Sequence, residues 1–322
     1  MITQKDIARK LGVSRSLVSR AITGSAGDIG ASKETVRKIR KMAEECGYVQ
    51  NAAALSLRGE GSMTIGVVVK DFADPFFGKM TGEIQALSKD RGFSVLLAGY
   101  SGNDESQPDI RSLQRYSPDA ILVCGSHLCT SWLRPFISKG VPVVQIGAGN
   151  DVKGLSRVEM DEEFGISLLL DHLKKLGHRE LGFVGAGTKT HLSREKLILN
   201  LARTTGMRLL PSHSVNEPGH GNAGYCCMEK LLRISVKKLP TAILCADDIT
   251  ALGALKALYE EGMLVPRHVS LTGIDDIPEA SLFIPALTTV RSPVAEMVRT
   301  AFGIVTGGKG QIEKVKVRPE LV

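Results

Sequence analysis

The chain has 322 residues, 43% of them hydrophobic and 23% charged, which is ordinary for a globular protein large enough for more than one domain. No apolar run reaches the roughly 18 residues that span a bilayer, and the N-terminus lacks the apolar segment of a secretory signal, so we expect a cytoplasmic protein with no membrane partner. The net charge of +7 is uneven, because the first sixty residues hold eleven Lys or Arg against six Asp or Glu. A basic head on a near-neutral body indicates a polyanionic partner for the head.

The first two predicted helices lie close together near the N-terminus. Thr3 can cap the first helix, with Asp6 three positions later in the place that completes a capping box, and Gly12 ends it. Ser14 can cap the second helix, which we expect over residues 15–23 with its apolar residues on one face. Two short helices joined by a tight turn form the helix-turn-helix pattern of many DNA-binding proteins.

The second helix carries the polar side chains that this pattern would present to DNA. Its free side holds Arg15, Ser16, Ser19 and Arg20. Arginine can bond guanine O6 and N7 in the major groove, and serine hydroxyls can bond phosphates. On this observation alone, a plain helical hairpin without DNA-binding function is the alternative interpretation.

A third helix and a linker complete the head. After a glycine-rich loop over residues 24–31, Ser32 opens a helix that runs to about Cys46. Residues 48–62 then have the composition of a linker, and their centre, 51–58, is long enough for two helical turns. A helix so short is marginal in water on its own, so we expect it to depend on a partner.

From residue 63 onward, apolar runs alternate with amphipathic stretches. The first series is TIGVVV, SVLLAGY, DAILVCG and PVVQIG, and the second is ELGFVGA, TAILCAD and VSLTGID. Runs that are apolar on both faces predict parallel strands covered by helices on both sides, and two such series predict two similar lobes. Ligands of these sheets bind beyond the carboxyl ends of the strands, so we expect a ligand site between the facing lobes.

Several segments of the chain resemble the LacI/GalR family of bacterial repressors. The resemblance is carried by KDIARKLGVSRSLVSR, GYVQNAAALSLR and TIGVVVKDFADPFF, and it continues through AILCADDITALGALKAL, VSLTGIDDIP and PALTTVRSP. It implies an all-α helix-turn-helix headpiece, a hinge helix, and an α/β two-lobed core of parallel sheets similar to periplasmic sugar-binding proteins. It also implies a homodimeric transcriptional regulator of repressor type that binds palindromic, double-stranded operator DNA and responds to a small, sugar-like effector. We expect no cofactor and no enzymatic activity.

The resemblance also sets the expected domain boundaries. The headpiece, the hinge with its linker, and the core are expected at residues 1–49, 50–62 and 63–322. Within the core, we expect lobe 1 over about 63–158 and 289–311, and lobe 2 over about 159–288 and 312–322.

The family's base-reading positions match Arg15, Ser16 and Arg20. The full DNA-binding set that we expect adds Thr3, Ser14 and Ser19 in the headpiece, and Asn51, Ala54 and Leu57 in the hinge. Leu57 matches a leucine that wedges between base steps in the minor groove, with packing against the core as the alternative. The chain departs from the family at Leu17, where the family usually has Thr, and at Gln50, where it usually has Pro.

The first lobe supplies three of the expected effector-binding residues. Asp74, Phe76 and Phe77 lie in a segment that resembles the family's effector loop. Asp74 can accept hydrogen bonds from ligand hydroxyls, and one of the phenylalanines can present its ring to a sugar. The alternative is that Asp74 caps a helix beginning at Pro75, with a phenylalanine in the core.

The second lobe supplies the other three. Asp275 ends a predicted strand at the family's effector carboxylate, Arg194 is the candidate for the effector arginine, and Asp247 stands where the family usually has Asn. Loop capping is the alternative for both acids, and the register at Arg194 is ambiguous by two residues. Gly147 stands where the family often has Asp, and no aromatic residue matches the one expected near Gly219, so a known sugar specificity does not transfer.

Two other classes of protein deserve comparison. A secreted solute-binding protein would share the two-lobed core, but it would need an export signal and would not need a basic head. An enzyme is disfavoured because the sequence contains no nucleophile motif, phosphate-binding loop or metalloprotease motif. Cys124, His127 and Cys129 lie close together, but they follow an apolar run without a second ligand pair, so we interpret the cysteines as buried or loop thiols.

Overall fold

The computed structural model describes residues 2–23, 31–48, 61–100, 107–218, 222–235, 239–307 and 312–322. The chain divides into two compact units, residues 1–62 and 63–322, and the second begins where the core was expected to begin. The expected hinge helix over 51–58, with Asn51, Ala54 and Leu57, lies outside the described residues. Most of the glycine-rich loop before the third helix does so as well.

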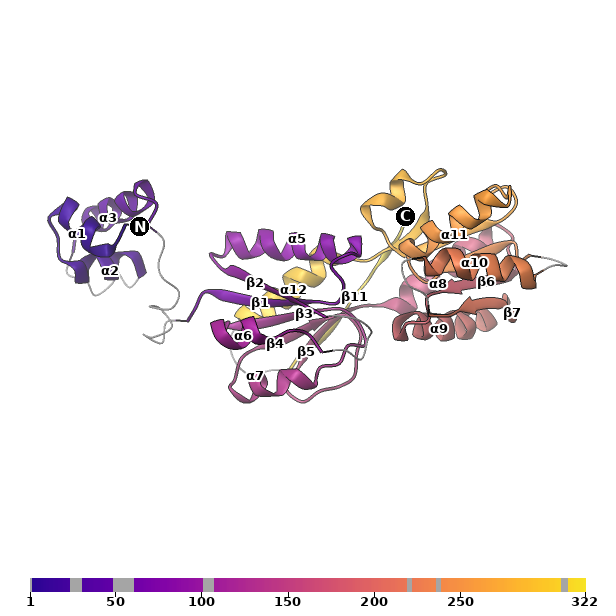
Figure 1. Ribbon diagram of the computed structural model, residues 1–322, viewed down its shortest axis with the longest axis horizontal. Helices are drawn as coiled ribbons and strands as arrows, with labels where there is room; N and C mark the ends of the chain where they lie inside the picture. Colours follow the sequence, from indigo (N-terminus) through magenta and orange to yellow (C-terminus); the bar gives the residue numbers. More distant parts are fainter. Residues whose placement is uncertain are drawn as a thin grey trace. The chain divides into compact units, whose positions relative to one another are not determined.

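Three helices form the described part of the headpiece: α1 (Gln4–Leu11), α2 (Arg15–Thr23) and α3 (Lys33–Glu45) (Figure 1). Each contributes apolar residues to one small core, and Ile7, Val18 and Ile39 are fully buried in it. The expected amphipathic spacing is therefore confirmed in all three helices.

The caps of these helices explain where they begin and end. Thr3 accepts a hydrogen bond from the Asp6 amide, and the Asp6 carboxylate accepts one from the Thr3 amide, so the capping box is complete. Gly12 ends α1 in the left-handed conformation with φ 64°, which glycine adopts without steric cost. The Ser14 hydroxyl accepts from the Leu17 amide at 3.2 Å, and Ser32 caps α3 in the same way through Thr35.

Six parallel strands form the sheet of the first lobe in the described chain, in the order β11-β5-β4-β3-β1-β2. Their bounds are β1 (Thr64–Val69), β2 (Ser94–Gly99), β3 (Ala120–Cys124), β4 (Val143–Ile146), β5 (Ser156–Met160) and β11 (Lys314–Val317). One face is covered by α5 (Pro75–Asp90) and α12 (Val294–Thr306), and the other by α6 (Arg111–Tyr116), the 3-10 turn η2 (Ser131–Leu133) and α7 (Arg134–Ser138).

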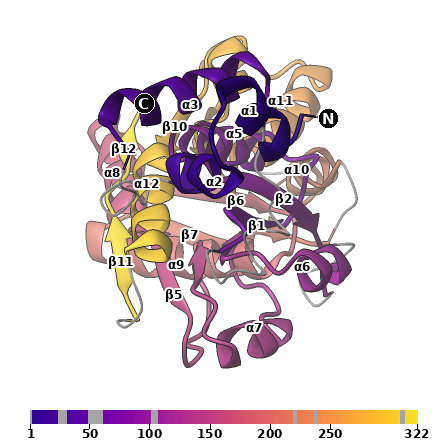
Figure 2. The same cartoon turned by 90° about the vertical axis from the view of Figure 1, so that its left-hand side faces the viewer.

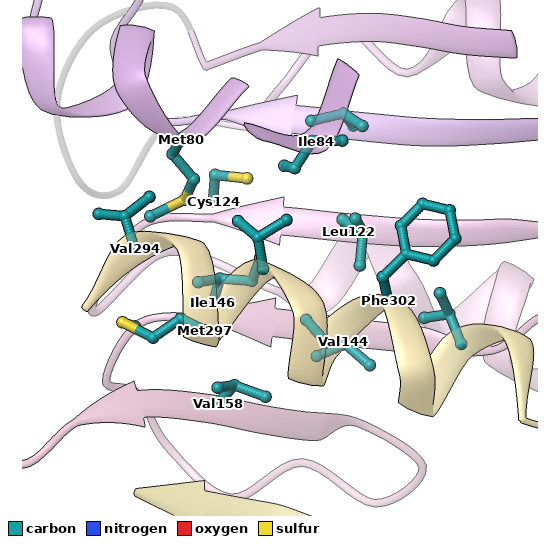
Figure 3. Packing of buried hydrophobic residues seen from close by; sticks show 14 of the residues in the cluster. Met80, Ile84, Leu122, Cys124, Val144, Ile146, Val158, Val294, Met297 and Phe302 are labelled. Atoms are coloured by element: carbon teal, nitrogen blue, oxygen red, sulfur yellow. The ribbon is translucent and has the colours of Figure 1, made fainter. Parts of the chain in front are cut away.

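The central strands of this sheet are buried on both faces. Every residue of β3 is buried, as expected for a strand between two helical layers. Figure 3 shows how α12 lays Val294, Met297 and Phe302 over the strands, beside Met80 and Ile84 of α5. Cys124 packs in this same core, which agrees with its interpretation as a buried thiol.

The second lobe repeats the arrangement, with the strand order β12-β10-β9-β8-β6-β7 in the described residues. Its strands are β6 (Glu180–Gly185), β7 (Arg208–Asn216), β8 (Ala242–Cys245), β9 (Ser270–Asp275), β10 (Thr288–Arg291) and β12 (Glu320–Leu321). Of these described strands, only β12 runs antiparallel to its neighbour. One face is covered by α8 (Glu162–Lys175) and α9 (Lys189–Thr205), and the other by α10 (Ala223–Ile234) and α11 (Asp248–Glu260). The 3-10 turn η3 (Pro278–Leu282) follows β9.

The expected lobe boundaries were wrong by a few residues at each crossing. Strand β10 belongs to the second sheet, so the chain returns to the first lobe after residue 291 and not after 288. Strand β11, expected in lobe 2, pairs with β5 at the edge of the first sheet (Figure 2). Val315 and Val317 pack into the first lobe's core, which holds this strand there. The chain thus crosses to the second lobe for the last time between β11 and β12.

Candidate DNA-binding surface and effector cleft

The exposed face of α2 carries the residues expected to read DNA bases. Arg15, Ser16 and Arg20 are exposed, while Val18 and Ala21 on the opposite face are fully buried. The Nε of Arg20 donates to the Ser16 carbonyl at 3.4 Å, which holds its side chain along the helix. The Nε of Arg40, on α3, donates to the Ala21 carbonyl at 2.9 Å and anchors the end of α2. The structure therefore exposes two guanidinium groups on the side of α2 that is not packed in the headpiece core.

The remaining headpiece residues of the expected set have structural tasks as well. The Thr3 and Ser14 hydroxyls cap α1 and α2, and Ser14 also shares a hydrogen bond of 3.0 Å with Ser16. Ser19 is half-buried and already has a partner within the protein. Leu17 packs against the headpiece core, which accounts for an apolar residue at this position.

A cleft of about 670 Å³ opens in the core where the strands of both sheets end. All six residues expected to bind an effector line it. The first lobe contributes Asp74, Phe76 and Phe77, and the second contributes Arg194, Asp247 and Asp275. The carboxyl ends of parallel strands thus bring together side chains that are up to two hundred positions apart in sequence.

Arg194 lies at the base of the second lobe's half of this cleft. Its guanidinium is buried and donates to the Ala246 carbonyl at 2.7 Å and to Glu162 Oε1 at 3.0 Å, with Asp275 Oδ1 at 3.5 Å. Although burial opposes the charge, the carboxylates of Glu162 and Asp275 raise the pKa of Arg194 above its ordinary value. The cation is permanent, and its donors are directed at the protein.

Asp275 ends β9 in a conformation unusual for a non-glycine residue, with φ 115°. Oδ1 accepts a hydrogen bond from the Ser292 hydroxyl at 3.1 Å, in addition to its contact with Arg194. Burial raises the pKa of Asp275, and the Arg194 guanidinium offsets part of that rise. Strained backbone and a buried acid in one cleft are features found at binding sites.

Asp247 caps α11, as the loop-capping interpretation predicted, and it also lines the cleft. Oδ1 accepts from the Thr250 amide at 2.7 Å, and Oδ2 lies 2.8 Å from His191 Nε2. The Ala186 amide donates to His191 Nδ1 at 2.8 Å, so the ring proton lies on Nε2 and is donated to Asp247. Burial alone would raise the pKa of Asp247, but these hydrogen bonds outweigh burial and lower it.

Asp74 caps a helix, as one of the two alternatives from the sequence predicted, and it also lies in the cleft. Its Oδ1 caps α5 by accepting from the Phe76 amide at 2.9 Å, and the residue lines the cleft. Burial, reinforced by the negative charges of Asp275 and Asp247, raises the pKa of Asp74 to about 7. Phe77 is buried in the first lobe's core and Phe76 is half-buried against it, so both rings pack while they line the cleft.

Steric constraints explain why this chain has Gly147 at a position where the family often has Asp. This glycine lines the cleft with φ 136°, and a Cβ added here would lie 2.7 Å from the Gly125 carbonyl carbon and oxygen. Both the backbone conformation and the close approach exclude a side chain. The first lobe therefore presents Asp74 without a second acid at this position.

Several polar residues of the cleft were not predicted as effector residues, among them Glu162, Thr190 and Ser292. Glu162 follows the cap of α8 and has the sequence signature of any acid in the first turn of a helix. Its partner Arg194 is 32 positions away, so no local pattern connects them. Thr190 and Ser292 stand beside expected elements, but hydroxyl residues there are common and carry no specific signal.

Comparison with known proteins identifies the family of the chain. Residues 3–51 match the model of bacterial regulatory proteins of the lacI family, and residues 170–322 match the periplasmic binding protein-like domain. The chain is 30% identical over 312 residues to the HTH-type transcriptional repressor PurR of Vibrio parahaemolyticus serotype O3:K6 (strain RIMD 2210633), covering 95% of this chain and 91% of that protein. The chain belongs to the LacI family. It is accordingly a DNA-binding transcriptional regulator with a periplasmic-binding-protein-like core.

Solved structures agree with this fold. The lac repressor dimer bound to operator and the anti-inducer ONPF superimposes with a TM-score of 0.79 at 22% identity, covering 100% of this chain and 97% of that one. The complex of the transcriptional regulator CelR with cellobiose gives a TM-score of 0.68 at 26% identity, covering 100% and 98%. Within the described ranges, no helix is long and apolar enough to cross a membrane.

Proposed function

We propose that this LacI-family regulator is a cytoplasmic homodimer that represses transcription from a palindromic operator and that a small polar effector, a sugar or sugar derivative, changes its operator affinity. The observation that carries the proposal is the placement of the six expected residues around one cleft, with Asp74 on the first lobe and Asp275 on the second. A ligand held by both acids would favour one closure of the lobes over another. The cellobiose complex of the related CelR supports a sugar-like ligand.

The headpiece supports the operator part of the proposal. Arg15 and Arg20 are exposed on a helix whose other face is buried, which is the arrangement that places arginines in a major groove. Two such helices related by a two-fold axis would read two half-sites of opposite orientation, so a dimer calls for a near-palindromic operator. The operator complex of the lac repressor dimer supports this arrangement.

The test is a thermal-shift screen of the full chain against a library of small polar compounds, followed by an operator titration with each hit. At least one hit should change operator affinity. Asp275→Ala should abolish that response while leaving effector-free operator binding nearly intact, because Asp275 lies in the cleft and not in the headpiece.

The matched control is Asp171→Ala, which removes an exposed acid of α8 in the same lobe. It should respond to the hit as the wild type does. A wild-type response in Asp275→Ala would show that the effector binds elsewhere. If no hit changed operator affinity, the core would be a dimerisation scaffold and the sensor function would be wrong.

A further inference from the structure

The cleft carries an excess of negative charge on both lobes. In the described chain, six carboxylates and three cationic side chains line it. The acids are Asp71, Asp74, Glu159, Glu162, Asp247 and Asp275, and the cations are Lys70, Arg194 and Lys256. Repulsion reaches from one lobe to the other, because Asp275 and Asp247 of the second lobe both contribute to the raised pKa of Asp74 on the first.

The cations of the cleft are already engaged by the protein. Arg194 is held by Glu162, Asp275 and the Ala246 carbonyl. Lys256 lies 3.8 Å from Glu260 and 5.2 Å from the centre of the Tyr225 ring, and Lys70 also has a partner within the protein. A phosphate or carboxylate on a ligand would have to displace these partners in a field that is already negative.

Asp74, in contrast to the cations of the cleft, is an acid without a partner of opposite charge among the described residues. Oδ1 accepts from a backbone amide, and within the described residues no cationic side chain contacts the carboxylate. The residue is half-buried and lines the cleft together with Asp247 and Asp275, so its ionised form is poorly compensated. A positive charge brought by a ligand would supply the missing partner.

A metal ion does not fit this role. Among the described residues, no group of three or more His, Cys, Asp or Glu side chains is arranged to hold a metal. The cleft of about 670 Å³ has the size of a small-molecule site. The hydroxyl oxygen of Thr190, which also lines the cleft, is buried and has no hydrogen-bond partner within the described residues, so it is available to a polar group of a ligand.

We propose that the effector carries a protonated amine, held between Asp74 of the first lobe and the carboxylates of the second, in an organic cation of the size of an amino sugar. This inference rests on the proposed function and narrows its ligand class. The amine would remove the repulsion between acids on facing lobes, so its charge would promote lobe closure. Hydroxyl groups of the same molecule would bond Thr190 and the remaining carboxylate lone pairs.

The test uses the full chain and a panel of compounds matched in shape and sorted by charge. Each set holds an amine, the corresponding alcohol, the N-acetyl derivative and the phosphate ester, for example glucosamine, glucose, N-acetylglucosamine and glucose 6-phosphate. Further sets are built on galactose, mannose and short amino alditols. Calorimetry should find the tightest ligand of the panel among the amines.

Asp74→Asn should weaken that amine at least tenfold and leave weakly bound neutral compounds unchanged. Asparagine caps a helix as well as aspartate does, so the variant should fold, which its melting temperature checks. The control is Asp90→Asn, at the exposed far end of α5, which should bind the amine as the wild type does.

The outcomes separate this inference from the proposed function. A neutral or anionic compound that binds tightest and changes operator affinity overturns the amine assignment and leaves the sensor function standing. An amine that binds Asp74→Asn as tightly as the wild type also overturns the amine assignment and leaves the sensor function standing. An amine that binds through Asp74 without changing operator affinity supports the assignment and contradicts the sensor function. A panel in which nothing binds overturns both.

Discussion

Burial and neighbouring acids together make Asp74 a pH-dependent residue. Its pKa is raised to about 7 in the folded protein, well above the ordinary value of a carboxyl group. The folded state therefore binds this proton more tightly than the unfolded state does. The stability that the protonated form contributes is complete below about pH 4 and is lost as the pH rises through about 7.

Asp74→Asn should remove this dependence. We expect the variant to be more stable than the wild type by about 1–2 kcal/mol at pH 8 and to match it near pH 4, since the asparagine stays neutral and keeps the helix cap. Thermal unfolding of both proteins at the two pH values measures this. Asp248, whose pKa is also raised to about 7, titrates in both proteins and cancels in the difference. An equal difference at both pH values would contradict the assignment of the charge to Asp74.

For single residues, the sequence predicted which side chains line the cleft better than it predicted their hydrogen-bond partners. The resemblance to the family assigned Asp74, Asp247 and Asp275, and the strand pattern agreed with it, because all three lie at or beyond the end of an apolar strand, where the carboxyl ends of parallel strands converge. Capping and ligand binding were set as alternatives, but Asp74 and Asp247 use one oxygen for the cap while the residue faces the cleft. The Glu162 contact with Arg194 could not be predicted, since it depends on how α8 packs against α9.

Strands with continuous apolar runs could be predicted, including β2 at a sheet edge, whereas edge strands of mixed composition could not. Strands such as β3 and β8 are continuous apolar runs, so their sequence alone indicates a covered parallel sheet. Strands β7 and β11 are largely exposed at sheet edges, and their mixed composition resembles that of a loop. The lobe boundaries were misplaced for this reason, because they depended on assigning β10 and β11 to a sheet. The assignments of Asn51, Ala54 and Leu57 to DNA stay predictions from the resemblance.

Helix α2 supports a prediction about sequence preference. Arg15 is exposed in its first turn, whereas Val18 and Ala21 of the same helix are buried. If it bonds a guanine bidentately, Arg15→Ala should cost about 1–3 kcal/mol of operator affinity and relax the preference at one base pair in each half-site. Competition binding against operators mutated at single positions measures both effects.

If Arg15 contacts a phosphate and not a base, its substitution should have a different effect on DNA binding. In that case Arg15→Ala would weaken operator and random DNA alike and would reduce the salt dependence of binding, with no loss of preference at any one base pair. Glu34→Ala, on the exposed start of α3, is the control for general effects on the headpiece, and it should leave the base preference unchanged.

At the scale of the whole molecule, two binding events act on one chain, and thermodynamics makes their coupling reciprocal. If an effector changes operator affinity by some factor, saturating operator must change effector affinity by the same factor. The expected size is a coupling free energy of about 1–3 kcal/mol, or roughly 5- to 150-fold in either affinity.

The effector that emerges from the screen should therefore be titrated by calorimetry into the protein alone and into its operator complex. The ratio of the two dissociation constants should equal the ratio of operator affinities measured with and without effector, whether the effector releases the protein or tightens it. Asp171→Ala should reproduce both ratios. Equal effector affinity for free and operator-bound protein, alongside an operator affinity that the effector does change, would mean that the ligand acts through a second site or on the DNA, and the cleft between Asp74 and Asp275 would not be the site of regulation.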